Sequence, residues 1–142
     1  MIDINNNLKQ QTLSQPILIN GIGLHSGVNV QMKLLPAEAN FGIKFFRTDL
    51  DKNNIIEALW SNVSNTNLST TISNRFGSSI STIEHLMSAL SGLHIDNLKI
   101  EIDGPEVPIM DGSSKDFVNL IESFPLRKLE ENRKIIKVKK NI

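Results

Sequence analysis

The sequence predicts an α+β domain, a two-layer sandwich in which a mostly antiparallel sheet is covered by two helices. Residues 28–35 and 97–102 alternate apolar and polar side chains, which is the period-two pattern of half-buried strands. Residues 82–93 and 113–124 instead carry apolar side chains at helical spacing along one face. Together these patterns indicate one layer of strands and one layer of helices.

The remaining elements follow in chain order. Further strands are expected at residues 11–19, 42–48, 55–62 and 67–73, the last two being weaker candidates. A glycine-rich turn at residues 21–27 joins the first two strands, and Pro125 ends the second helix because proline cannot continue a helix. Residues 133–142 are predicted as a last strand. It is either an edge strand protected by lysines or the opening of a second domain.

Composition limits the possible functions. The chain has 142 residues, enough for one core, and its 15 basic and 15 acidic side chains give no positive footprint for nucleic acid. With no Tyr and one Trp, an RNA-binding α+β domain is also disfavoured. Because cysteine is absent, a metal would have to be held by His, Asp or Glu. No secretion signal or membrane span is visible, so we expect a cytoplasmic protein.

Glu84 and His85 are the candidate functional pair. His85 points away from the apolar stripe of its predicted helix, into a face made only of small residues. That face consists of Ser81, Ser88, Ala89 and Gly92. Its lack of Lys, Glu and Gln indicates that protein, a metal or a substrate covers it. Glu84 also has a structural explanation, because the run STIE at residues 81–84 matches a capping box.

Other polar residues give weaker signals. A catalytic zinc ion typically uses three protein ligands, and the histidines of the chain are His25, His85 and His94. His85 and His94 would lie on opposite sides of a helix running through both, so we expect no complete zinc site within this chain. His25 lies in the glycine-rich turn, and Asp111 or Ser113 is expected to cap the second helix.

Several short runs occur in a characteristic order. They are GIGLHSG (21–27), RTDL (47–50), NLSTT (67–71), STIEHL (81–86), IDN (95–97) and PEVPIMDGS (105–113). In this order they resemble the UDP-3-O-acyl-N-acetylglucosamine deacetylase family, LpxC. The resemblance extends from about residue 11 to residue 142, and so many ordered motifs make chance a poor explanation.

The resemblance implies a reaction and a cofactor. The family removes the N-acetyl group from UDP-3-O-acyl-N-acetylglucosamine, a UDP-sugar lipid, during lipid A synthesis in Gram-negative bacteria. It uses one Zn²⁺ held by two histidines and an aspartate. In this sequence His85 matches the first zinc ligand and Glu84 matches the general base.

The resemblance also implies less direct roles for other residues. Leu68, Ser69 and Thr70 match a segment that lines the substrate site. His25 and Asp111 match positions near that site, without a firm role.

A domain organisation follows from the same resemblance. The family enzyme has two similar domains whose helices pack between two sheets, which would cover the small-residue face beside His85. We expect residues 1–126 to form the first domain, and residues 127–142 to be the linker and first strand of a truncated second domain. The other zinc ligands, from a His-Lys-x-x-x-Asp motif, would belong to that missing domain. The chain alone is therefore expected to be inactive, to bind zinc weakly and to self-associate through its uncovered helix face.

A second hypothesis comes from another class of protein. The chain could be a non-catalytic module in which Glu84 caps its helix and His85 lies at a protein interface. The two hypotheses differ in whether the reading frame continues past Ile142 into a His-Lys-x-x-x-Asp segment.

Overall fold

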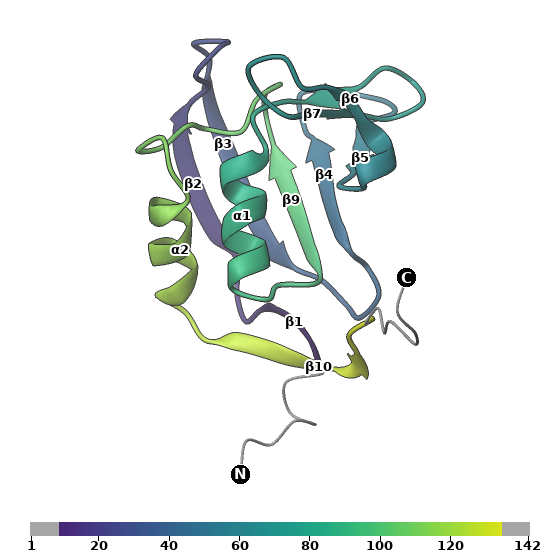
Figure 1. Cartoon of the computed structure of the whole chain (residues 1–142), viewed down its shortest axis with the longest axis vertical. Coiled ribbons are helices and arrows are strands. Elements are labelled where there is room, and N and C mark those ends of the chain that lie inside the picture. Colours follow the sequence, from purple (N-terminus) through teal and green to yellow (C-terminus); the bar gives the residue numbers. More distant parts are fainter. Residues whose placement is uncertain (1–8, 135–142) are drawn as a thin grey trace, which may run out of the picture.

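A computed structural model describes residues 9–134 and has an α+β fold (Figure 1). Within these residues the central sheet has five strands, and its neighbouring strands are antiparallel except for β4 and β9, which run parallel. In sheet order the strands are β2 (Ile17–Ile22), β3 (Asn29–Pro36), β9 (Leu98–Ile102), β4 (Ile43–Arg47) and β5 (Ile55–Glu57). The predicted fold class is confirmed.

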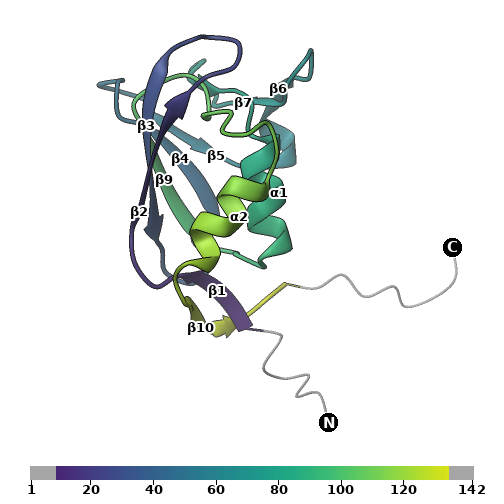
Figure 2. The ribbon, with the colours of Figure 1, turned by 90° about the vertical axis from the view of Figure 1, so that its left-hand side faces the viewer.

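Two helices, α1 (Glu84–Gly92) and α2 (Lys115–Glu122), lie beside each other on one face of this sheet (Figure 2). Both begin two residues later than the sequence pattern predicts, at residues 84 and 115 instead of 82 and 113. The alternation predicted for the strands holds, since Met32 and Leu34 of β3 are fully buried while Lys33 between them is exposed. Neither described helix is long and apolar enough to cross a bilayer.

A three-stranded sheet lies beside the edge strand of the central sheet. Its strands are β6 (Val63–Asn65), β7 (Thr71–Ser73) and β8 (Ser79–Ile80). Arg47, at the end of β4, is buried and donates to the Ser79 carbonyl at 2.7 Å and to both Asp49 carboxylate oxygens. Hydrogen bonding from Arg47 holds the pKa of Asp49 below its ordinary value. The RTDL run therefore ties the small sheet to the central one.

The strands predicted at residues 55–62 and 67–73 are shorter in the structure. β5 covers only the first three residues of its segment and is followed by a 3₁₀ turn (Trp60–Asn62). β7 begins only at Thr71, because the Asn65 side chain accepts the N–H of Asn67 at 2.8 Å and starts a turn there. In this region a hydrogen bond from the backbone to the Asn65 side chain forms a turn where the sequence pattern predicts strand.

The predicted strand at residues 11–19 is in fact two strands in different sheets. β1 (Lys9–Leu13) ends before Pro16, and β2 begins at Ile17. β1 pairs antiparallel with β10 (Leu126–Asn132), which the sequence analysis assigned to a linker. The predicted strand at 133–142 lies outside the described residues from position 135 onward. The division into domains at residue 126 remains a prediction.

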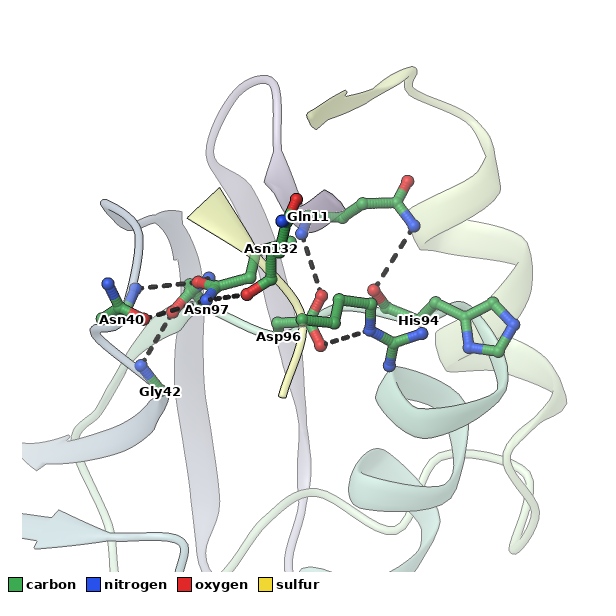
Figure 3. Close-up of polar contacts among 9 residues, drawn as sticks. Gln11, Asn40, Gly42, His94, Asp96, Asn97 and Asn132 are labelled. Carbon is green, nitrogen blue, oxygen red and sulfur yellow. Dashed lines mark hydrogen bonds and ion pairs between the residues drawn. The ribbon is translucent and has the colours of Figure 1, made fainter. Parts of the chain in front are cut away.

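A buried amide network supports the β1–β10 pair (Figure 3). Asn97, 1% exposed, donates to the Gln10 side chain at 2.8 Å and accepts the N–H of Gly42 at 2.9 Å. Gln10 in turn donates to the carbonyl of Asn132 at 3.0 Å. Asp96 accepts the N–H of Gln11 at 2.9 Å. The IDN run is therefore explained by packing at the end of the sheet away from the candidate site.

Candidate active site

Glu84 is the first residue of α1, and its side chain does not cap the helix. The N-cap position is Ile83, where no side-chain capping bond forms, so the capping-box prediction is wrong. Glu84 Oε2 instead accepts the N–H of Thr70 at 3.0 Å. A carboxylate in the first turn also interacts favourably with the helix dipole. The account of Glu84 as a cap, on which the non-catalytic hypothesis relied, has no support in this geometry.

The Thr70 bond brings the predicted substrate-lining segment to Glu84. Ser69 and Thr70 are half-buried, and Leu68 is 84% exposed with a φ of 63°. A positive φ is uncommon for a leucine, and this exposed side chain stands two residues before Thr70, which is anchored on Glu84. The structure thus joins the segment Leu68–Thr70 to Glu84 through the backbone N–H of Thr70, across 14 residues of sequence.

One ring nitrogen of His85 makes no hydrogen bond within the described residues. Its Nδ1 is shielded from solvent and has no hydrogen-bond partner among residues 9–134. Buried polar atoms are normally paired, so an unpaired imidazole nitrogen marks a place for a further group. An imidazole nitrogen is a common ligand of zinc, and the atom present fits such a role.

The face of α1 beside His85 is narrower than the sequence predicts. Ser88 and Gly92 are exposed as expected, whereas Ala89 is 1% exposed and belongs to the core. The prediction placed Ala89 on the open face. It fails because α1 packs beside α2 as well as over the sheet, so its buried stripe is wider than one contact would require.

Glu106 is the site residue that the sequence analysis missed. It is 1% exposed, and its carboxylate accepts the backbone N–H groups of His25 at 3.0 Å and of Ser26 at 2.8 Å. The hydroxyl of Thr82 donates to the same carboxylate at 2.7 Å. The sequence does contain one sign of this role, a charged residue within the otherwise apolar run PEVPIM. A glutamate buried in such a run needs hydrogen-bond partners.

The hydrogen bonds to Glu106 decide its charge. Burial alone would raise the pKa of this carboxyl, but the donors from His25, Thr82 and Ser26 outweigh it and lower the pKa from 4.5 to about 2. The carboxylate is therefore ionised across the physiological range. Gly23 leaves room for it, since a Cβ there would stand 2.5 Å from Glu106 Oε2.

Among residues 9–134, the side chains of His25 and Asp111 form no hydrogen bond or ion pair with Glu84 or His85. The His25 side chain is exposed on the β2–β3 loop, and only its backbone is engaged. Asp111 is exposed and accepts hydrogen bonds from the hydroxyl of Ser113 and from its N–H, both at 2.9 Å, and these lower the pKa of its carboxyl. Ser113 accepts the N–H of Lys115, the first residue of α2, at 3.1 Å, but the N-cap position is Ser114 and no side-chain capping bond forms there, so the prediction that Asp111 or Ser113 caps this helix is wrong. Within residues 9–134, no three His, Asp or Glu side chains are grouped closely enough to hold a metal ion.

Fold and site together define a class of protein. It is an α+β domain that presents a carboxylate and an imidazole side by side at the start of one helix. A buried acidic residue, Glu106, anchors the loop and the turn next to this pair.

Comparison with known sequences assigns this domain to a family. The family profile described as LpxC, UDP-3-O-acyl N-acetylglycosamine deacetylase, matches residues 10–142. The chain therefore belongs to the LpxC family.

Similar proteins carry the same description. Proteins named UDP-3-O-acyl-N-acetylglucosamine deacetylase from Pseudoalteromonas atlantica, Syntrophotalea carbinolica and Geobacter sp. (strain M21) are 48%, 50% and 52% identical to this chain. The matches cover 95%, 94% and 94% of this chain, and 44%, 43% and 43% of those proteins. The chain thus spans less than half the length of these relatives.

The depressed pKa of Glu106 predicts acid lability. Because its folded pKa of about 2 lies below the ordinary 4.5, its contribution to stability is full above pH 4.5 and is lost as the pH falls toward 2. The loss should be on the order of 2–3 kcal/mol. Urea unfolding between pH 7 and pH 2.5 should show the wild-type chain approaching the Glu106→Gln variant as the pH falls. Curves that stay parallel over this range would contradict the assignment.

Proposed function

We propose that this chain contributes Glu84 and His85 to the active centre of a zinc-dependent deacetylase. The substrate is UDP-3-O-acyl-N-acetylglucosamine, whose N-acetyl group is hydrolysed during lipid A synthesis in the cytoplasm of a Gram-negative bacterium. Membership of the LpxC family supports the reaction. The observation that carries the role of this chain is the shielded, unpartnered Nδ1 of His85, next to a carboxylate that does not cap its helix.

His85 is the residue that would hold the metal. A bound Zn²⁺ polarises an amide carbonyl and lowers the pKa of a coordinated water. Two further ligands, a His and an Asp by resemblance to the family, are expected from a segment outside these 142 residues.

Glu84 acts as the general base in this proposal. One carboxylate oxygen is held by the N–H of Thr70, whereas Oε1 has no hydrogen-bond partner among residues 9–134. An oriented carboxylate with one free oxygen can take a proton from an attacking water and return it to the leaving amine. The Thr70 bond fixes the direction of the free oxygen.

The segment Leu68–Thr70 forms one wall of the substrate site in this proposal. Its backbone is anchored on the general base, and the exposed Leu68 side chain offers an apolar contact at the rim. Any substrate group held against this segment would therefore lie close to Glu84. The side chains of His25 and Asp111 are exposed, so in this proposal any contact of these two residues with the substrate is made by the side chain.

The small-residue face of α1 is the proposed contact for the second domain of the family. Ser88, Ser91 and Gly92 are exposed and would let another layer of protein approach closely. In the 142-residue chain alone, this face is expected to mediate self-association.

Zinc titration of the 142-residue chain tests the metal assignment. Calorimetry should show weak binding that is lost in His85→Ala and unchanged in His94→Ala, since His94 is an exposed histidine beyond the end of α1. The chain alone should not hydrolyse the substrate, because one imidazole cannot form a catalytic zinc site. Sub-micromolar binding that survives His85→Ala would show that the ligand has been misassigned.

Activity can be tested in a chimera in which this chain replaces the matching 133 residues of the Geobacter relative. The chimera should deacetylate UDP-3-O-acyl-N-acetylglucosamine. Glu84→Gln should lower kcat by about 10²–10⁴-fold without loss of bound zinc, because it removes only the proton acceptor. Glu101→Gln on β9, which removes a surface charge paired with Lys99, is the matched control. An undiminished kcat in Glu84→Gln would exclude Glu84 as the base.

A further inference from the structure

The turn that leads into α1 is strained at Thr82. Its φ is 57°, a left-handed conformation that a β-branched residue adopts only when the surrounding structure enforces it. Thr82 is 3% exposed and stands just before the first turn of α1. The backbone at Thr82 therefore sets the direction in which Glu84 and His85 leave the small sheet.

Four hydrogen bonds tie this turn to the segment at residues 105–107, one of them from the Ser81 hydroxyl to the Pro105 carbonyl at 3.3 Å. The N–H of Ser81 donates to the Pro105 carbonyl at 3.0 Å, and the N–H of Val107 donates to the Ser81 carbonyl at 3.0 Å. These two are backbone bonds that any side chain at position 106 would permit. The bond from the Thr82 hydroxyl to Glu106 Oε1 at 2.7 Å is the one that depends on a side-chain acceptor.

The same carboxylate also holds the β2–β3 loop. Oε2 of Glu106 accepts the N–H of Ser26 at 2.8 Å, and Oε1 accepts the N–H of His25 at 3.0 Å. No cationic side chain among residues 9–134 is paired with Glu106, so these directional hydrogen bonds fix the carboxylate in place. Glu106 thus joins the loop that carries His25 to the strained turn before Glu84.

We propose that Glu106 is a positioning residue for the Glu84–His85 pair. Through the Thr82 hydroxyl it holds the strained turn, and through the turn it sets where the Glu84 carboxylate meets Thr70 and where the His85 ring points. Describing the pair as catalytic rests on the proposed function, whereas the mechanical link from Glu106 to the pair does not.

The test is an NMR comparison of the 142-residue chain with variants of the link. Thr82→Val keeps the shape and the β-branch but removes the hydroxyl, and Thr82→Ser restores the hydroxyl. We expect Thr82→Val to shift the Thr70 amide and the His85 ring signals, and Thr82→Ser to return both toward their wild-type positions. Glu106→Gln should shift the same two signals and also the amides of His25 and Ser26.

The control signals lie at the other end of α1. The His94 ring is exposed and should be unchanged in every variant, and Glu101→Gln should move none of the reporter signals. If Glu106→Gln does not fold, the Thr82→Val and Thr82→Ser pair decides the question alone.

The result that would overturn the proposal is specific. It is a folded Thr82→Val or Glu106→Gln variant in which Thr70 and His85 are unmoved, since Glu106 would then only anchor the β2–β3 loop. These signals require neither zinc nor substrate. A failed zinc titration or an inactive chimera would therefore count against the proposed function and leave this link untouched.

Discussion

The buried carboxylate of Glu106 is the interaction on which the candidate site depends. An ionised carboxylate removed from water is tolerated only when hydrogen bonds replace the lost hydration. Two backbone N–H groups and one hydroxyl do so here, and they come from parts of the chain far apart in sequence. Satisfying this one charge therefore fixes the β2–β3 loop and the entry to α1 relative to each other. It also accounts for Gly23, because a side chain there would collide with the carboxylate.

The placement of the site follows from this constraint. The β2–β3 loop, the start of α1 and the small sheet lie at the same end of the molecule (Figure 1). Arg47 holds the small sheet to the central sheet, and Thr70 connects its β6–β7 loop to Glu84. The amide network around Asn97 closes the opposite end, where β1 meets β10 (Figure 3). The amide network around Asn97 and the candidate chemistry are thus separated along the length of the sheet.

Much of the fold could be predicted because hydrophobic periodicity is a local signal. The alternation in β3 and β9 and the apolar spacing in both helices are visible in the sequence and agree with the structure. β10 was missed because LRKLEEN has no regular alternation, and its partner β1 lies more than a hundred residues away. The capping box misled because Thr82 adopts a positive φ, so the helix begins at Glu84. No local sequence pattern predicts that a threonine will adopt a positive φ.

In the candidate site, too, some features could be predicted from the sequence and others could not. The roles of Glu84 and His85 came from resemblance to a family, since spacing alone favoured a structural cap. No sequence pattern identifies the role of Glu106, because two of its partners are backbone N–H groups. Nearly every residue has such a group. Leu68 and Thr70 could be named from the sequence, but the hydrogen bond from Thr70 to Glu84 is visible only in the three-dimensional arrangement.

A double-mutant cycle between Glu106→Gln and Thr82→Val, followed by urea unfolding at neutral pH, tests the central claim most directly. Valine keeps the β-branch of threonine but lacks its hydroxyl, so the cycle measures the coupling between the Thr82 hydroxyl and the charged Glu106 carboxylate. The account predicts coupling, with Thr82→Val costing at least about 1 kcal/mol less in the Glu106→Gln background than in the wild-type chain. Additive effects within about 0.3 kcal/mol would show that Glu106 does not hold the turn before Glu84.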